Sequence, residues 1–195
     1  MAFIDVLRRL ISKTEREQHA KCMSLLALAR DRDFQRAETA KYLYDLCVEQ
    51  ASIFVQEETR KPESPFRGVS RAAFFHEILT MTFWLMDKKL FNGKKVLLSA
   101  VHDIYFRSFS SPDPAEKRTE ALEARYRVYK HEWDEISGHQ DEFGAAVAQQ
   151  IFGTENVGRI DERSFWIVWY ADDLSKLLGR MKKIWKAAGF TPAAE

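Results

Sequence analysis

The run from Arg71 to Leu90, RAAFFHEILTMTFWLMDKKL, constrains the fold more than any other part of the sequence. Placed on an α-helix, its apolar side chains cover a wide arc of the circumference, while its polar side chains fall on one narrow stripe. A helix with so wide an apolar arc is enclosed by other elements on most sides. The sequence therefore predicts a central helix whose polar stripe is its solvent-exposed edge. The stripe contains His76, Glu77, Thr80, Asp87 and Lys88.

Helix boundary motifs recur along the rest of the chain, and no stretch shows convincing β-strand alternation. Thr14 and Glu17 form a capping box, Pro62 and Pro65 break a helix, and Asp113 precedes a proline at a first helical position. We expect an all-α protein, a multi-helix bundle or irregular helical array of seven or eight helices in a single domain spanning residues 1–195. Residues 2–12 are a candidate peripheral amphipathic helix, and 189–195 a flexible tail. The predicted helices span about 2–12, 14–31, 34–59, 70–91, 94–108, 114–136, 141–152 and 161 onward.

The segment LLALARDRDFQRAETAKYLYDL resembles one helix-turn-helix hairpin of a tetratricopeptide repeat, with Phe34 and Ala37 opening its second helix. No second copy follows along the chain. The resemblance therefore implies an antiparallel pair of helices and no repeat array.

Composition limits the functional classes. The chain has 30 Lys and Arg residues against 29 Asp and Glu residues, a formal net charge of +1, so no nucleic-acid partner is predicted. Aromatic residues make up 13% of the chain, which predicts an aromatic-rich core. The two cysteines suggest no disulfide framework, the N-terminus lacks the order of a signal peptide, and no apolar run reaches the ~20 residues that cross a bilayer. We expect a cytoplasmic protein.

Recognisable catalytic motifs are missing from the sequence. His76 and Glu77 resemble the start of a zinc-protease helix, but the second ligand position holds Thr80. No histidine follows a carboxylate at the spacing of a di-iron site, and neither a serine nucleophile elbow nor a phosphate-binding loop is present. We therefore predict no catalytic residues, no metal site and no cofactor. Enzymatic activity stays open, although the sequence favours a protein without it.

Two sets of residues are candidates for binding. The first would line a pocket between helices, where His76 and Glu77 supply a proton acceptor and a donor. This interpretation makes the protein a small-ligand binder or an enzyme. The candidate pocket residues are His76, Glu77, Thr80, His102, Asp103 and Tyr105.

The second set is apolar surface on the first and last helices. The amphipathic segment 2–13 presents Phe3 and Leu7, and the last helix is apolar nearly all round at Phe165, Val168 and Trp169. This surface favours a non-catalytic protein–protein interaction or regulatory module, with a protein partner or self-association. A further alternative is peripheral membrane association through residues 2–13.

Overall fold

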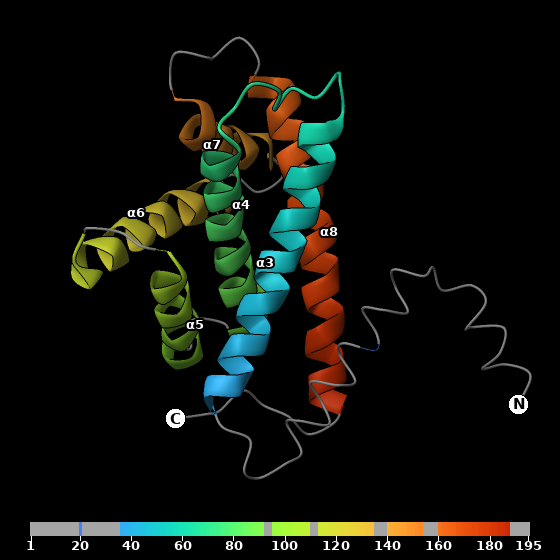
Figure 1. Cartoon of the computed structure of the whole chain (residues 1–195). Helices are drawn as coiled ribbons and strands as arrows, with labels where there is room; N and C mark the ends of the chain where they lie inside the picture. Colours follow the sequence, from blue (N-terminus) through green and yellow to red (C-terminus); the bar gives the residue numbers. More distant parts are fainter. Residues whose placement is uncertain are drawn as a thin grey trace, which may run out of the picture.

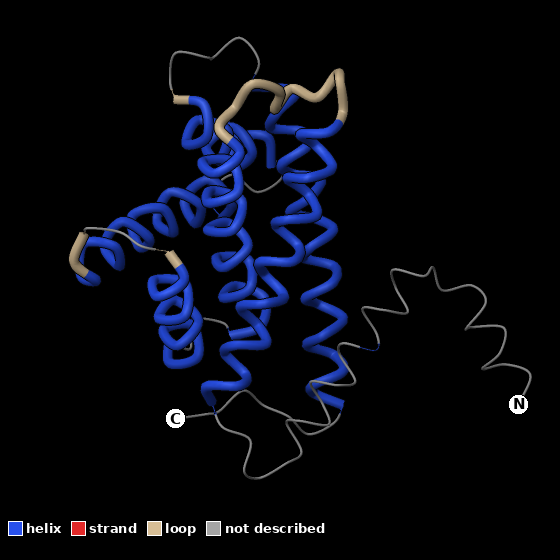
Figure 2. Tube along the Cα trace, viewed as in Figure 1, coloured by secondary structure: helices blue, strands red, loops and turns tan. Residues whose placement is uncertain are grey.

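The computed structural model describes residue 20 and residues 36–91, 95–109, 113–134, 140–153 and 160–187. Within these ranges the chain forms 6 α-helices and one π-helical turn and contains no strand, which confirms the all-α class (Figures 1 and 2). The helices are α3 (Arg36–Arg60), α4 (Arg71–Met86), α5 (Lys95–Ser108), α6 (Ala115–Asp134), α7 (Gln140–Phe152) and α8 (Ile160–Ala187), and the π turn η1 is Asp87–Phe91.

Helix α4 is the central element. It packs against α3, α6, α7 and α8 (Figure 1). Ser70 caps its N-terminus by accepting a hydrogen bond from the Ala73 amide at 3.4 Å. Every side chain from Glu77 to Met86 is buried, so the central position predicted from the wide apolar arc is confirmed.

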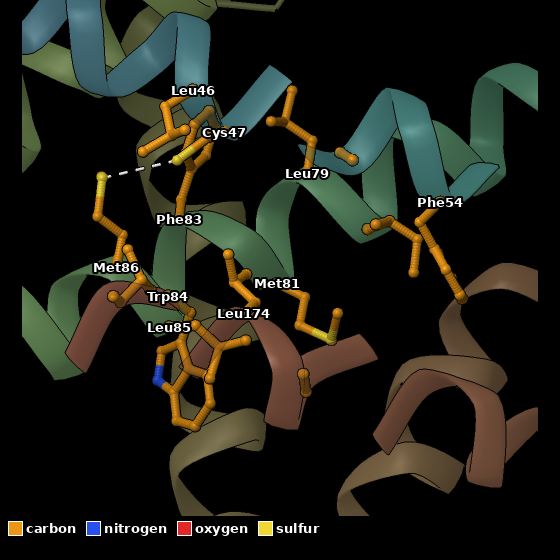
Figure 3. Packing of buried hydrophobic residues seen from close by; sticks show 14 of the residues in the cluster. Leu46, Cys47, Phe54, Leu79, Met81, Phe83, Trp84, Leu85, Met86 and Leu174 are labelled. Atoms are coloured by element: carbon orange, nitrogen blue, oxygen red, sulfur yellow. Dashed lines mark hydrogen bonds between the residues drawn. The ribbon is translucent and has the colours of Figure 1, made fainter. Parts of the chain in front are cut away.

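Groups of aromatic rings in the core lie towards both ends of α4. Near its N-terminal end the ring centroids of Phe66 and Phe74 lie 4.4 Å apart. Phe54 of α3 stacks on Tyr170 of α8 at 4.5 Å, which ties the two long helices together. At the other end, Trp84 contacts the rings of Tyr129, Trp133 and Phe143. At this same end of α4, the Cys47 thiol lies 3.6 Å from the Met86 sulfur (Figure 3).

Helices α7 and α8 approach each other closely at Gly144. A Cβ atom built there would lie 2.5 Å from the Ser164 carbonyl oxygen and 2.8 Å from Cγ2 of Val168. Only glycine fits this contact without a backbone shift. Through it, α7 is held against α8 while its other side packs on α4 and α6.

One difference from the predicted elements concerns the end of the central helix. The helix expected at 70–91 is α-helical only to Met86 and continues as η1, where a wider turn changes the angular position of the following side chains. Leu90 and Phe91, at the end of that turn, are both buried. The helices expected at 2–12 and 14–31, the first half of the tetratricopeptide-like hairpin and the tail at 189–195 lie outside the described residues. The number of helices and the single domain therefore stay predictions.

Candidate functional site

A pocket of about 780 Å³ opens between α4, α5 and α6, with one residue contributed by α7. Its α4 wall includes His76, Glu77 and Thr80, three of the five residues of the polar stripe predicted within residues 71–90. The α5 side is aromatic, and the α6 side combines small apolar residues with two arginines. The pocket is lined by Ala73, His76, Glu77, Thr80, Tyr105, Phe106, Phe109, Arg118, Ala121, Leu122, Ala124, Arg125, Val128 and Gln150.

Glu77 is the most unusual residue of the pocket, because it is a carboxyl group on a buried stretch of α4 with only 8% of its surface exposed. The Tyr129 hydroxyl donates a hydrogen bond to its Oε1, and Arg125 Nε lies 3.5 Å from its Oε2. Arg125 Nη1 in turn donates to Gln150 Oε1 of α7. Burial raises the pKa of Glu77, while the Tyr129 hydrogen bond and the Arg125 charge oppose that rise. Two residues of α6 therefore contact the carboxyl group that α4 carries, and Gln150 of α7 holds one of them in place.

His76 lies one residue away on the same wall. Its Nδ1 is 3.3 Å from the Tyr105 hydroxyl of α5, and its ring centroid is 4.4 Å from that of Phe109. Burial lowers the pKa of His76, which favours the neutral imidazole. The Thr80 hydroxyl donates to the His76 carbonyl at 2.8 Å, so this threonine satisfies its own polar group within α4.

Arg118 begins the α6 side of the pocket. Its Nη1 donates to the Phe106 carbonyl oxygen at 2.9 Å, and its guanidinium carbon lies 4.9 Å from the centroid of the Phe106 ring. Its Nε is buried and has no hydrogen-bond partner. The guanidinium is thus held against α5 from two directions, with one donor left unpaired.

The structure divides the six pocket candidates of the sequence. His76, Glu77, Thr80 and Tyr105 line the pocket described above, whereas His102 and Asp103 do not. The solvent-exposed edge expected for α4 is wrong at Glu77 and Thr80, which are buried, because α5 and α6 flank this side of the helix.

His102 and Asp103 line a second pocket of about 590 Å³, which α6 and η1 also border. There His102 Nε2 lies 2.8 Å from the Tyr126 hydroxyl. Burial lowers the pKa of His102 from 6.5 to about 4, with the Asp103 charge acting in the opposite direction.

Sequence reasoning missed the residues that α6 and α7 contribute. Arg118, Arg125, Tyr129 and Gln150 complete the polar side of the site. The spacing of Arg118, Leu122, Arg125 and Tyr129 does place them on one helical face, which was the available signal. Basic residues at that spacing also suit a solvated helix whose long side chains cover apolar surface, so the pattern alone did not distinguish the two.

The apolar candidates of the last helix lie away from this pocket: Trp169 borders a groove between α3 and α8, and Val168 faces α7 at Gly144. Phe165 is 60% exposed and Trp169 is 52% exposed, while Val168 is half-buried. A shallow groove of about 240 Å³ beside Trp169 reaches Ile53 of α3. Phe3 and Leu7, the candidates on segment 2–13, lie outside the described residues.

Among the residues that the structure describes, no group of three or more histidine, cysteine, aspartate or glutamate side chains could hold a metal ion. No described helix is both long and apolar enough to cross a bilayer. Comparisons with models of known protein families, with curated proteins and with solved structures found no match. The local geometry is therefore the basis for a functional proposal.

Proposed function

We propose that this protein binds a small organic molecule in the pocket between α4, α5 and α6. The observation that supports the proposal is the burial of the Glu77 carboxyl group on the most apolar helix. Arg125, Tyr129 and His76 lie near this group, at a cavity of about 780 Å³. A buried ionisable group is costly unless it is paired or has a role, and groups with shifted pKa values cluster at functional sites.

The pocket has the composition of a ligand site. Small-molecule sites usually occupy about 300–1,000 Å³ and combine apolar walls with a few convergent polar groups. Here Phe106, Phe109 and Val128 supply apolar wall, and the polar groups gather around Glu77. Three consecutive α-helices build it and α7 adds Gln150, so its shape depends on how these helices pack against one another.

The test is a substitution that fills the pocket, with the amphipathic dye 1-anilinonaphthalene-8-sulfonate as the probe. Ala121 lines the pocket and its side chain is exposed, so Ala121→Trp is expected to block the site without disturbing the core. Glu120→Trp adds the same indole at the adjacent exposed position, which does not line the pocket. Calorimetric titrations should show probe affinity reduced at least about tenfold by the first variant only.

A background variant removes the main competing site for the dye. Trp169→Ser eliminates the indole of α8 that is 52% exposed, so both tryptophan substitutions are compared in that background. Equal dye affinity in the Ala121→Trp and Glu120→Trp proteins would contradict the proposal.

A second candidate function, a protein–protein interaction or regulatory module, is favoured by the surface on α3 and α8. Trp169 and Ile53, which is 45% exposed, border the groove between these helices, and Phe165 is a further exposed aromatic side chain on α8. Multi-angle light scattering over a range of protein concentrations tests self-association. A mass that increases with concentration in the original chain but not in Trp169→Ser would support it; a constant monomer mass in both would refute self-association through this face.

A further inference from the structure

The charges around the pocket do not balance among the described residues. Its lining includes two guanidinium groups, those of Arg118 and Arg125, and a single carboxyl group, that of Glu77. Arg125 is the cation paired with Glu77, at 3.5 Å. With His76 neutral, the form that its burial favours, and Glu77 ionised and paired with Arg125, Arg118 is the single excess positive charge of the pocket.

The contacts of Arg118 leave it unneutralised. Its neighbours are the carbonyl oxygen and the ring of Phe106, and no described carboxylate lies within ion-pairing distance of it. Its Nε is buried with no acceptor. Arg118 is half-buried, and partly removing a guanidinium from water without a counter-charge is unfavourable; a charge-assisted hydrogen bond to an anion would compensate that cost.

The surfaces around Arg118 are apolar. Phe106 and Phe109 lie on the α5 side, and Leu122 and Val128 lie along α6. Val128 is 37% exposed, so part of this apolar wall is accessible from solvent. A ligand that matches both the charge of Arg118 and this apolar wall has an anionic group at one end and a hydrocarbon or aromatic body at the other.

We propose that the ligand is an organic monocarboxylic acid, with its carboxylate against the Arg118 guanidinium and its apolar body along Phe106, Phe109 and Val128. This inference rests on the proposed ligand-binding function and specifies its chemistry. A single excess cation matches a single negative charge. A phosphate dianion would leave a negative charge uncompensated beside the Glu77 carboxyl group.

The experiment compares carboxylic acids with their own primary amides, which have nearly the same shape and no charge. The probes are 4-phenylbutyrate, 3-phenylpropionate, octanoate and decanoate, each with its amide and titrated calorimetrically into the full chain. At least one acid should bind about tenfold to a hundredfold more tightly than its amide, because only the acid pairs with the guanidinium. Phenyl phosphate, added as a dianion, should bind more weakly than that acid.

A matched pair of variants then assigns the preference to one residue. Arg118→Gln should abolish the preference for the acid and leave affinity for the amide unchanged within about twofold. Lys117→Gln removes an equal charge from the adjacent exposed position, which does not line the pocket, and should retain the preference. Circular dichroism of both variants verifies that each is folded.

The outcomes separate the two proposals. If acids and amides bind equally well and Ala121→Trp blocks both, the ligand-binding function survives and the carboxylate inference is overturned. If phenyl phosphate binds most tightly, the inference is overturned in favour of a phosphorylated ligand. If no acid or amide binds, the carboxylate inference also fails, and the dye titration independently decides the ligand-binding function.

Discussion

His102 is predicted to make the protein sensitive to acid. The imidazole lies partly buried between α5 and α6, with Nε2 2.8 Å from the Tyr126 hydroxyl, and its pKa falls from 6.5 to about 4 because burial disfavours the charged form. The unfolded chain therefore binds this proton more readily than the folded protein. Stability from the neutral imidazole is present above pH 6.5 and is lost as the pH falls toward 4. Charged groups lining the same pocket are Asp87, Asp103, Glu123, Arg127 and Lys130.

The size of the effect follows from the two pKa values. At pH 7 the imidazole is mostly neutral in both states, so it contributes almost nothing to the pH dependence. At pH 4.5 the unfolded chain is protonated and the folded imidazole is mostly neutral, so His102 lowers the free energy of unfolding by about 2 kcal/mol. For a domain of this size that corresponds to a urea midpoint lower by roughly 1 M.

The assay is urea unfolding of the original chain and of His102→Gln at pH 7 and pH 4.5. Glutamine removes the titration and keeps a group that can hydrogen-bond Tyr126. The variant should gain about 2 kcal/mol relative to the original chain between the two pH values. His131→Gln, at an exposed position on α6, is the control and should show no comparable gain. If the stability difference between the original chain and His102→Gln is the same at both pH values, the reasoning is refuted.

Two further predictions concern packing and thiol chemistry. Gly144→Ala should lower the free energy of unfolding by about 1–3 kcal/mol, because its Cβ would lie 2.5 Å from the Ser164 carbonyl oxygen. Gly179→Ala, where a Cβ meets nothing within 4 Å, should raise the free energy of unfolding by up to about 1 kcal/mol. If urea titrations show similar effects for both variants, the close contact between Gly144 and Ser164 is contradicted. Burial raises the pKa of Cys47, so a Cys22→Ser protein should react with Ellman's reagent only after unfolding, and rapid labelling in native buffer would argue against the buried thiol.

Much of the described fold could be predicted because its signals are local. The apolar arc of residues 71–90 predicted a central helix, and the prolines at 62 and 65 predicted the break between α3 and α4. The predicted helices from residue 34 onward agree with the described ones to within about two residues, apart from η1. Helix formation and termination depend on residues a few positions apart, so one sequence carries that information.

The candidate site was predicted only in part. The sequence identified His76, Glu77 and Tyr105, because polar residues in or near an apolar run are conspicuous. Separating His102 and Asp103 from them required the orientation of α5, which no local pattern specifies. The pocket role of Arg118 and Arg125 on α6 was equally hard to predict, since an arginine on an amphipathic helix can face either solvent or a pocket.

What the sequence determined by itself was the helical class, the approximate extent of the described helices and the central place of α4, all of which follow from periodicity and capping. The tertiary structure decided the environment of the polar stripe. Glu77 is buried because α6, about fifty residues later in the chain, brings Arg125 and Tyr129 against it. Such contacts depend on how helices cross in space, and their free energy exists only when distant segments meet. Periodicity could show that α4 has a polar side, but only the packing shows that this side faces a pocket.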